Sequence, residues 1–541
     1  MKEAFWIIDQ LIQQGVVHFC IAPGSRSTPL ALAIADHPKA QRHVHFDERG
    51  LGFYTLGIGL GSKKPAVIIV TSGTAVGNLL PSVMEAHHSA IPLILLTADR
   101  PPELRDCSAN QSTDQAKIFQ PFVRWQVDLP CTGDEAYFRS IAAQAFFYTA
   151  QNPPGPVQVN CQFREPFCFE QVLLPQGKQL ELQLPKFTIG AQTSPSAKGM
   201  ILVGRLPKDE DVRAILKLAE KLKWPIFADL LSNARNLLSF EQIRNFDWIL
   251  KKGSDLRPDA ILHFGERLTS KKCLEWQANL HAKEYLHVSP LPFLQDPERL
   301  LTRRIQADIS SFCASFTAQS DPNWLKYWKE QDAEIDEILD FSFANDALLT
   351  EAHAMRTLSK ILPPQFAVYL GSGMPIRDAN NFLFPEKCRG FFANRGLSGI
   401  DGNIATAIGL SNGLQSPLLI FIGDQASLHD LNSLALLKKA QYPVFLIISN
   451  NFGSGIFSHL PVSHSPHSEE LFGAAHKWSF EGAVKMFDLP YVRIDSSFEE
   501  KMRAVFSGNQ SAVIELISCR TQNYQFHKRL TETVQTNTAR I

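Results

Sequence analysis

The sequence predicts an α/β protein of three doubly wound domains, and three observations support this fold class. Short runs of Leu, Ile, Val and Phe alternate along the chain with stretches of helical periodicity. At 541 residues the chain is too long for one hydrophobic core. The alternation is interrupted twice, by a polar stretch at 171–198 and by a charged helical stretch at 324–339. We therefore expect domains at 1–175, 195–335 and 345–541.

The first two domains are predicted from apolar runs rich in β-branched residues, which indicate strands between helices. The glycines at 57, 59 and 61 resemble a dinucleotide-binding loop, but that loop needs a strand immediately before it, and here the strand follows. We expect these glycines to permit close helix packing. The predicted strands are 18–22, 43–46, 66–70, 93–96 and 153–162, then 199–203, 225–228, 260–264 and 284–287. The predicted helices of the first domain are 4–14, one starting at Thr28, a Gly-rich helix between the strands at 43–46 and 66–70, and 76–86.

The third domain, from about Leu348, holds the clearest supersecondary pattern. Two apolar runs, 418–422 and 444–448, flank a stretch with apolar residues at helical spacing, 428–437. This pattern predicts a strand, a crossover helix and a parallel strand.

Polar residues follow both strands of this predicted unit. Gly423-Asp424 comes after the first strand and Asn450-Asn451-Phe452-Gly453 after the second. Because parallel strand ends meet at one edge of the sheet, a carboxylate and an amide oxygen should lie close together there. Hard oxygen ligands suit a Mg²⁺ ion that keeps positions open for substrate phosphates. Taken singly, each residue is better explained by ordinary turn and helix-cap chemistry, and only the pair favours a ligand site.

Composition narrows the class of protein. With 53 Lys and Arg against 54 Asp and Glu, the net charge of −1 gives no long-range attraction to nucleic acid or to an anionic membrane. The nine cysteines show no CxxC or Cys/His metal spacing, which favours a reducing compartment and argues against zinc or disulfides. The first residues resemble an amphipathic helix rather than a signal peptide, and no apolar run approaches bilayer length. We therefore expect a cytoplasmic protein without a nucleic-acid or membrane partner.

The pair of polar strand ends resembles the diphosphate and metal motif of thiamine diphosphate (ThDP) enzymes, although Gln425 stands where that motif usually has Gly. ThDP chemistry also needs a carboxylic acid hydrogen-bonded to the pyrimidine ring nitrogen. Glu48, at a predicted strand-to-helix junction, suits this role. An acidic residue in a first helical turn can instead simply complement the helix dipole, and Asp47 could serve in principle.

Several further segments have a recognisable order and spacing along the chain. They are IAPGSRSTPL (21–30), FDERG (46–50), TSGTA (71–75), LTADRPPEL (96–104), ANQ (109–111), NRGLSGIDG (394–402) and the strand ends of the third domain, with LTSKK (268–272) and WQ (276–277) in the middle. Together they resemble one family, the 2-succinyl-5-enolpyruvyl-6-hydroxy-3-cyclohexene-1-carboxylate synthases (MenD) of menaquinone biosynthesis. The similarity is strong in the first and third domains and weaker in the middle, and the position of Glu48 within the second segment selects it over Asp47.

The resemblance implies a fold, a reaction and partners. The three domains would be those of ThDP decarboxylase-like enzymes: pyrimidine-binding, central and diphosphate-binding. The enzyme would decarboxylate 2-oxoglutarate and add the resulting succinyl-semialdehyde carbanion equivalent to isochorismate. It would be a homodimer or a dimer of dimers, with each site shared between the pyrimidine-binding domain of one subunit and the diphosphate-binding domain of another.

The resemblance also implies site residues. Glu48 would be the catalytic acid, and Asp424, Asn451 and the carbonyl of Gly453 would bind Mg²⁺, with Mn²⁺ as a possible substitute. Because both substrates are dianions, cations are expected around them. Further cofactor contacts fall on Gly423, Ile400 and Ile456, and substrate contacts on Ser25, Arg26, Arg100, Asn110, Gln111, Lys271, Lys272, Arg377, Arg395, Phe457 and Leu460.

Three features beside these contacts set further expectations. Lys272 stands where the family has Arg, so a bidentate grip becomes a point charge. Gly371-Ser372-Gly373 replaces the family's usual Gly-Asn-Ser. The polar stretch 463–470 is a candidate lid over the site.

Three functions remain open from the sequence. The first is the synthase itself. The second is another ThDP lyase that acts on a different 2-oxo acid, and the Arg and Lys residues among the predicted substrate contacts argue against this function. The third is a non-catalytic protein that binds ThDP or another metabolite. The occurrence of Glu48 together with Asp424 and Asn451 argues against this function, because a binding protein needs no acid for proton transfer.

Overall fold

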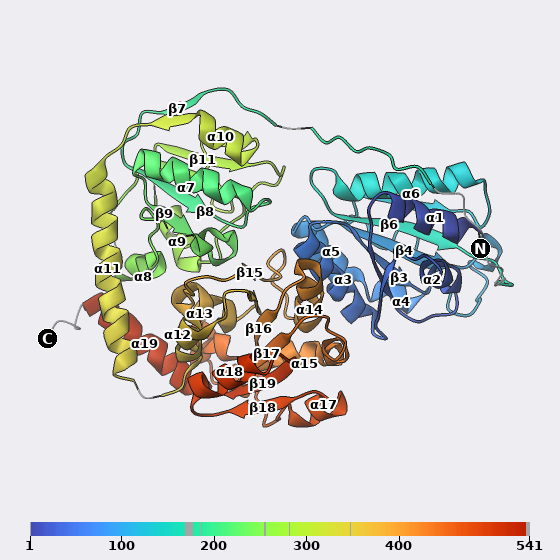
Figure 1. The fold of residues 1–541 in the computed structure, drawn as a ribbon. Helices are drawn as coiled ribbons and strands as arrows, with labels where there is room; N and C mark the ends of the chain where they lie inside the picture. The colour runs from blue at the N-terminus through green and yellow to red at the C-terminus, as the bar shows by residue number, and fades with distance from the viewer. Residues whose placement is uncertain are drawn as a thin grey trace.

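The computed structural model describes residues 2–167, 177–185, 187–237, 239–253, 256–280, 282–346 and 348–536. Its three main sheets have six, five and six strands, and neighbouring strands within each are parallel (Figure 1). Helices cover both faces of each sheet, which is the doubly wound α/β architecture predicted.

The first domain has the strand order β2-β1-β3-β4-β6-β5. The predicted helix 76–86 is two helices, because Pro81 falls in the first turn of the second. The patterns did not indicate β5, an edge strand with exposed residues. Its elements are α1 Lys2–Gln13, β1 His18–Ile21, α2 Thr28–Ala35, β2 Gln41–Val44, α3 Glu48–Ser62, β3 Ala66–Val70, α4 Thr74–Gly77, α5 Leu80–His88, β4 Leu93–Asp99, η1 Pro102–Leu104, β5 Trp125–Leu129, α6 Glu135–Ala150 and β6 Pro156–Gln162.

The middle domain has the order β12-β11-β10-β8-β9. Residues 171–176 and 186 of the predicted linker lie outside the described residues, and its later part contains a short strand, β7, that pairs with β13. The elements are β7 Gln192–Ser194, β8 Gly199–Val203, α7 Glu210–Leu222, β9 Ile226–Ala228, η2 Leu230–Ser232, η3 Ala234–Asn236, α8 Phe246–Lys252, β10 Ala260–Phe264, α9 Lys271–Ala278, β11 Glu284–Ser289, β12 Arg303–Gln306, α10 Ile309–Ser315 and β13 Phe316–Ala318.

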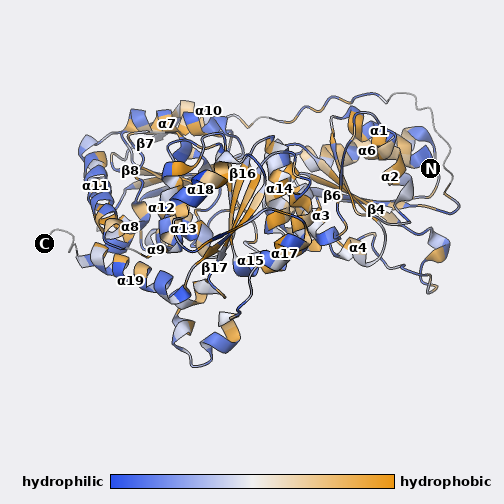
Figure 2. Ribbon diagram, turned by 60° about the horizontal axis from the view of Figure 1, so that its bottom comes forward, coloured by the Kyte–Doolittle hydropathy of each residue, from blue (hydrophilic) through white to orange (hydrophobic). Residues whose placement is uncertain are grey.

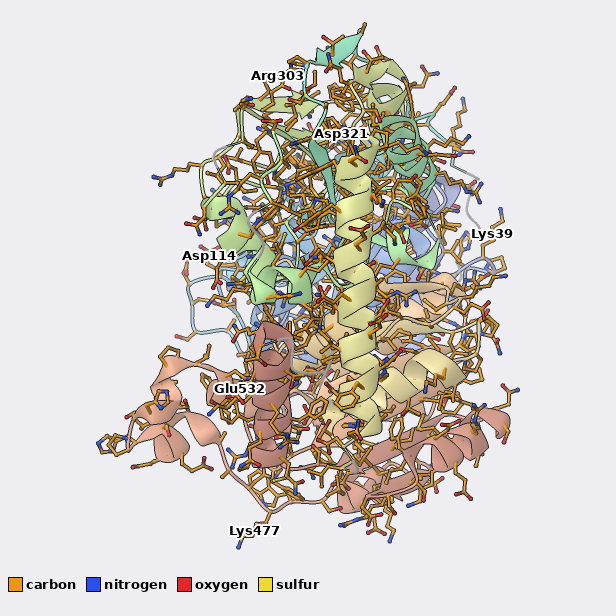
Figure 3. The ribbon with its side chains drawn as sticks, turned by 90° about the vertical axis from the view of Figure 1, so that its left-hand side faces the viewer. Lys39, Asp114, Arg303, Asp321, Lys477 and Glu532 are labelled. Carbon is orange, nitrogen blue, oxygen red and sulfur yellow. The ribbon has the colours of Figure 1, made fainter. Side chains whose placement is uncertain are left out.

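Helix α11, Pro322–Ala344, leads from the middle domain to the third domain along one side of the molecule, beside α19 (Figure 3). It contains the predicted charged helical stretch.

The third domain has the order β15-β14-β16-β17-β19-β18. Its elements are α12 Glu351–Ile361, β14 Ala367–Leu370, α13 Met374–Phe382, β15 Gly390–Phe392, α14 Asn403–Leu414, β16 Leu418–Gly423, α15 Asp424–His429, η4 Leu431–Ser433, α16 Leu434–Leu437, β17 Val444–Asn450, η5 Gly455–His459, η6 Pro461–His464, η7 Glu469–Gly473, α17 Glu481–Met486, β18 Tyr491–Ile494, α18 Phe498–Ser507, β19 Ala512–Ile517 and α19 Arg520–Thr536.

The predicted strand, helix and strand around Asp424 are present, but the connection is broken into α15, a 3₁₀ turn and α16. Between β17 and α17 the chain forms the short turns η5, η6 and η7, which project from the body (Figure 2).

Helix α3 of the first domain packs against α14 of the third. The two helices come so close that a Cβ on Gly57 would lie 1.9 Å from the carbonyl oxygen of Thr406, and one on Gly409 would lie 1.9 Å from that of Tyr54. This confirms the packing role expected for Gly57. Across the same contact, Asn412 Nδ2 donates to Tyr54 Oη at 2.6 Å.

The apolar strands form the interior, visible as the orange sheets in Figure 2. One buried cluster joins the first and third domains through α3 and α14, and another joins the middle and third domains. The third domain therefore packs against both others. In the described parts of the chain, no helix is long and apolar enough to cross a membrane.

Candidate cofactor and substrate site

The carboxylate of Asp424 lies at the end of β16, next to the end of β17. The parallel register pairs Gly423 with Ser449, which brings the residues after both strands together. Gly453 N donates to Asp424 Oδ2 at 2.8 Å, and His476 Nε2 lies 3.2 Å from the same oxygen. Burial raises the pKa of the Asp424 carboxyl, and these donors partly offset that effect.

Asn451 presents a free acceptor at this point. Its Nδ2 donates to Glu351 Oε1 at 2.8 Å, whereas its Oδ1 is buried without a hydrogen-bond partner among the described residues. A buried carbonyl oxygen without a partner is costly unless a ligand satisfies it. One carboxylate and one amide oxygen at adjacent strand ends fit a hard cation such as Mg²⁺.

The turn after Asn451 is built for this arrangement. Gly453 has φ of +151°, and a Cβ there would lie 2.5 Å from the carbonyl oxygen of Gly473. Glycine is therefore required where the chain turns back toward Asp424. The carbonyl of Gly453 accepts a hydrogen bond from Gly455 N at 3.1 Å.

Glu48 is the first residue of α3 and is half-buried. Asp47 caps this helix, accepting from Arg49 N at 3.0 Å. Arg49 Nη2 donates to the carbonyl of His429 at 2.7 Å, and Asn432 Nδ2 donates to Asp47 Oδ2 at 3.1 Å. Within one chain, the start of α3 is thus docked where α15, the helix opened by Asp424, ends.

Predicted substrate residues of the first domain gather around Ser72. Arg100 and Ser72 Oγ are hydrogen-bonded, and Gln111 Nε2 donates to the Ser72 carbonyl at 2.8 Å. Burial lowers the pKa of Arg100, and the positive charge of Arg26 lowers it further. Two arginines therefore lie close together at this strand edge, with Ser25 and Asn110 exposed in nearby loops.

Arg26 is already engaged within the first domain. Its guanidinium donates to the carbonyl of Phe163 at 2.9 Å, pairs with Glu165 at 2.8 Å and lies over the ring of Phe167.

A cavity of about 340 Å³ between the middle and third domains collects five of the predicted residues. Lys271 and Lys272 each lie near Glu275, with nitrogen to oxygen distances of 3.5 and 3.6 Å. Phe457 instead packs beside Phe472. The five predicted residues that line the cavity are Lys271, Lys272, Arg377, Ile456 and Leu460.

The same cavity has lining residues that the sequence did not indicate. Lys251 lies on α8, with its Nζ 3.9 Å from the centre of the Trp248 ring. His527 pairs with the buried carboxylate of Asp378 at 3.0 Å, and His459 packs edge-on against the His527 ring. Burial lowers the pKa of His459 to about 4, so it is neutral near pH 7. These residues come from helices remote in sequence, which no local motif connects.

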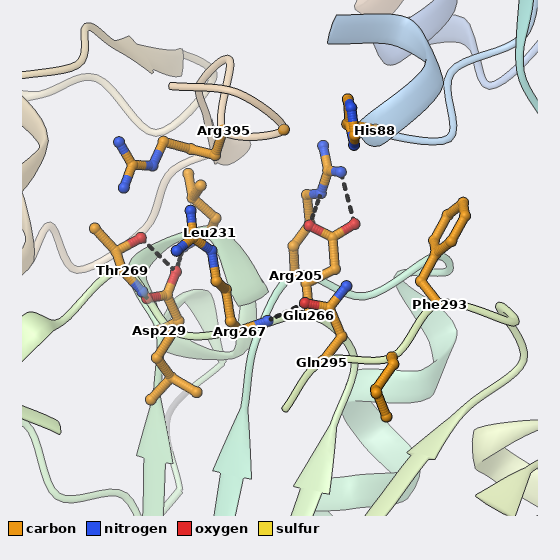
Figure 4. A pocket seen from close by; sticks show the side chains of 13 residues that line it. His88, Arg205, Asp229, Leu231, Glu266, Arg267, Thr269, Phe293, Gln295 and Arg395 are labelled. Atoms are coloured by element: carbon orange, nitrogen blue, oxygen red, sulfur yellow. Dashed lines mark hydrogen bonds and ion pairs between the residues drawn. The ribbon is translucent and has the colours of Figure 1, made fainter. Parts of the chain in front are cut away.

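Arg395 lines a neighbouring cavity of about 350 Å³ (Figure 4). Arg267 lies across this cavity from Arg395, and Arg205 pairs with Glu266 at 2.6 Å. Burial lowers the pKa of Arg395, and the charges of Arg377 and Arg267 lower it further. Thr269 lines both cavities, so the cavity of Arg395 and the cavity of Arg377 adjoin at this residue.

The departures from the family pattern have local structural consequences. Ser372 Oγ is buried without a hydrogen-bond partner among the described residues. Gly373 has φ of +103° at the start of α13, and its carbonyl accepts from the Arg377 guanidinium. Glycine therefore suits the positive φ at position 373, and the Ser372 hydroxyl keeps its hydrogen-bonding capacity unused among the described residues.

Two more predicted segments lie around the site. Ile400 is 36% exposed in the loop that leads to α14, where a Cβ on Gly402 would overlap the ring of Phe53 on α3. At the end of the predicted lid, Glu469 pairs with Arg520 at 2.7 Å.

Comparisons with known proteins agree with this architecture. Residues 1–118 match a family model described as the N-terminal TPP binding domain of thiamine pyrophosphate enzymes. Residues 190–370 match one described as the middle domain of thiamine pyrophosphate, and residues 371–516 match the C-terminal TPP binding domain.

Relatives named 2-succinyl-5-enolpyruvyl-6-hydroxy-3-cyclohexene-1-carboxylate synthase match nearly the whole chain. The protein of Rubrobacter xylanophilus is 36% identical, with 97% of this chain and 96% of the relative covered. That of Salinibacter ruber is 36% identical, with 98% and 95% covered, and that of Bacillus velezensis is 34% identical, with 97% and 96% covered. With these matches and its two ThDP-binding domains, the chain belongs to the family of thiamine diphosphate-dependent 2-succinyl-5-enolpyruvyl-6-hydroxy-3-cyclohexene-1-carboxylate synthases.

Proposed function

We propose that the protein decarboxylates 2-oxoglutarate and transfers the succinyl-semialdehyde unit by 1,4-addition to isochorismate, giving 2-succinyl-5-enolpyruvyl-6-hydroxy-3-cyclohexene-1-carboxylate and CO₂. The observation that carries the proposal is the cationic cavity beside the turn at Gly453. Lys271, Lys272 and Arg377 line it together with Ile456, three residues beyond Gly453. A dianionic substrate that reacts at ThDP would need cations in this position.

The cofactor would be held by the third domain. Asp424 Oδ, Asn451 Oδ1 and the Gly453 carbonyl would bind Mg²⁺, or Mn²⁺ in its place, and Gly423 would border the diphosphate. ThDP, when bound, supplies the electron sink for loss of CO₂. Glu48 would hold a proton toward the pyrimidine ring, and Ile400 and Ile456 would contact the cofactor as apolar neighbours.

The substrates would be held by cations from all three domains. Arg377, Lys271 and Lys272 would bind carboxylates in one cavity, and Arg395 would bind one in the cavity that adjoins it at Thr269. The Ser72 cluster would add Arg100, Arg26 and Gln111, with Ser25 and Asn110 as polar contacts. Phe457 and Leu460 would border the isochorismate ring and help to exclude water.

The assembly would be a homodimer or a dimer of dimers. The family resemblance supports sites shared between subunits, whereas the contacts of α3 with α14 and with His429 support a site assembled within one chain. The dimer thus stays a prediction, which the mixed-subunit experiment below tests. A cytoplasmic location also stays a prediction, supported by the free state of the cysteines in the described residues.

The decisive measurement is CO₂ release from 2-oxoglutarate with and without isochorismate. The proposal requires 2-oxoglutarate decarboxylation and formation of the adduct when isochorismate is added. Release from another 2-oxo acid but not from 2-oxoglutarate would indicate a different ThDP lyase. Binding of ThDP without CO₂ release from any 2-oxo acid would indicate a binding protein.

A further inference from the structure

Glu351 is a buried carboxylate that the chemistry above does not use. It is the first residue of α12 and is 3% exposed. Three side chains donate to its Oε1: Asn451 Nδ2 at 2.8 Å, Ser518 Oγ at 3.0 Å and Asn523 Nδ2 at 2.9 Å.

Capping of α12 does not explain this carboxylate. Thr350 is the N-cap residue, and its side chain accepts from His353 N. Burial raises the pKa of Glu351, and the donors, with Asn451 first among them, lower it. A buried carboxyl group is costly unless donors satisfy its oxygens, and here three side-chain donors meet at one oxygen.

The contact with Asn451 fixes which end of that amide faces the cofactor site. Glu351 N donates to Asn523 Oδ1 at 2.9 Å, so the Asn523 amide must donate its Nδ2 to Glu351 Oε1, and this oxygen acts as an acceptor. The end of Asn451 nearest the same oxygen is therefore the NH₂ group. The carbonyl Oδ1 is then directed away from Glu351, and it is the atom that has no partner among the described residues. Without Glu351, nothing in this contact would prevent the amide from turning its NH₂ group toward the cation.

We propose that Glu351 is a positioning residue for the metal: it orients Asn451 so that Oδ1, not Nδ2, faces Mg²⁺. The inference rests on the proposed metal site. Outer-shell partners of this kind typically change metal affinity by about 10- to 100-fold.

The test is a titration of the full-length protein with Mn²⁺ in the presence of ThDP, followed by electron paramagnetic resonance of free Mn²⁺. Glu351→Leu, which removes the acceptor, should weaken Mn²⁺ binding by about 10- to 100-fold. Ser518→Ala is the matched control, because it removes a different donor from the same oxygen, and it should change the affinity less than about threefold. Unchanged Mn²⁺ affinity in folded Glu351→Leu protein would overturn the proposal.

Two further variants keep the test decisive if Glu351→Leu does not fold. Glu351→Asp keeps the charge but withdraws the carboxylate by about one C–C bond, about 1.5 Å, and should weaken Mn²⁺ binding. Glu351→Gln keeps an acceptor oxygen without the charge and should stay within about threefold of the wild type. The opposite ranking of these two variants would show that charge, not orientation, matters, and would overturn the proposal.

A double-mutant cycle separates orientation from general damage to the structure. If Glu351 acts through Asn451, Glu351→Leu should have no further effect on Mn²⁺ affinity in an Asn451→Ala background. Additive losses would overturn the proposal. Failure of the wild-type protein to bind Mn²⁺ with ThDP would instead contradict the metal assignment on which the inference rests.

Discussion

The first and third domains have the same strand order, but side chains of opposite charge follow the equivalent strands of their two sheets. In each sheet the third and fourth strands in chain order are neighbours, β3 and β4 in one and β16 and β17 in the other. Ser72 and Arg100 follow the first pair, and Asp424 and Asn451 follow the second. One edge therefore suits an anion and the other a cation. The fold decides where side chains converge, and the residues there decide what can bind.

The helices α3 and α14 are also equivalent in the two domains, since each follows the second strand of its sheet. They pack against each other through glycines on both sides. The chain thus joins two copies of one architecture through the same element of each. The predictions that follow test whether the two domains differ in function as their strand ends indicate.

The largest effect is expected at the sheet edge of the third domain, where Asp424 and Asn451 are proposed to bind a metal ion. Asp424→Ala should abolish Mg²⁺-dependent ThDP binding and leave the fold intact, because it removes the only carboxylate proposed to bind the ion. Ser72→Ala, a change after the equivalent strand of the first domain, should leave that binding within about threefold. Isothermal calorimetry measures both. Unchanged ThDP affinity in Asp424→Ala protein would contradict the assignment and remove the contrast between the two edges.

The next effect concerns the acid that the first domain contributes. Glu48→Gln should keep ThDP affinity and lose on the order of 10²–10⁴ in rate, the usual effect of removing a positioned acid or base. Turnover measured at saturating ThDP tests this. An unchanged rate would mean that α3 only packs against the third domain.

Mixing Glu48→Gln with Asp424→Ala subunits tests which chains build a site. If the first domain of one subunit serves the third domain of another, verified heterodimers should recover activity. Heterodimers without activity would show that α3 completes the site of its own chain, as its contacts with His429 and Asn432 indicate.

A smaller effect is expected when a single Arg or Lys side chain that lines a proposed substrate cavity is replaced. Arg395→Ala and Lys272→Ala should each lower kcat/KM by about one to two decades, because one charge-assisted contact contributes roughly 1.5–3 kcal/mol. Lys272→Arg should be tolerated or improve binding. ThDP affinity should not change in any of them. Steady-state kinetics with each substrate varied separately would measure this, and alanine variants with wild-type kinetics would leave the two residues without a role in binding.

The contact between the two domains should respond to added volume. Gly57→Ala forces a Cβ against the Thr406 carbonyl and should destabilise the protein by about 1–3 kcal/mol. Gly77→Ala is the control, because a Cβ there meets nothing within 4 Å. It should be neutral or stabilise by about 0.4–1 kcal/mol. Urea unfolding measures both, and equal behaviour of the two variants would contradict the close approach of α3 and α14.

The smallest effect is a pH dependence at the same contact. Burial lowers the pKa of His43, which is hydrogen-bonded to Tyr54, from 6.5 to about 4. The unfolded chain therefore takes up this proton first, and His43 should remove about 1–2 kcal/mol of stability as the pH falls from 7 to 5. Urea unfolding at both pH values should show a smaller loss in His43→Gln protein than in the wild type. The exposed His88→Gln control should match the wild type, and equal losses in all three would exclude His43 as the source.

Periodicity in the sequence was enough to predict most strands of the first two sheets and the two central strands, β16 and β17, of the third. The strands β3 and β8 are buried along their whole length and continuously apolar, and β10 is equally buried with His263 as its one polar residue, so the predicted bounds of all three agree with the structure. Edge strands carry a weaker signal, because one side is exposed: β5 was not indicated, and β2 lies two residues before its predicted position. The predicted helix 76–86 is divided into α4 and α5 at Pro81. A proline break is a local signal that the sequence contains, but the prediction did not use it.

The sequence by itself determined that Asp424, Asn451 and Glu48 lie at strand ends or helix starts, because they occur in local motifs with recognisable spacing, and their chemical roles are predictions from those motifs. Only the tertiary structure decided which remote residues support or join them. Glu351 contacts Asn451 across 100 positions of the chain, Lys251 and His527 line the cavity of Arg377 from separate helices, and Arg395 lines the cavity that adjoins it at Thr269. Such contacts depend on how whole helices pack between domains, and packing is set by burial and shape over many residues rather than by any local pattern.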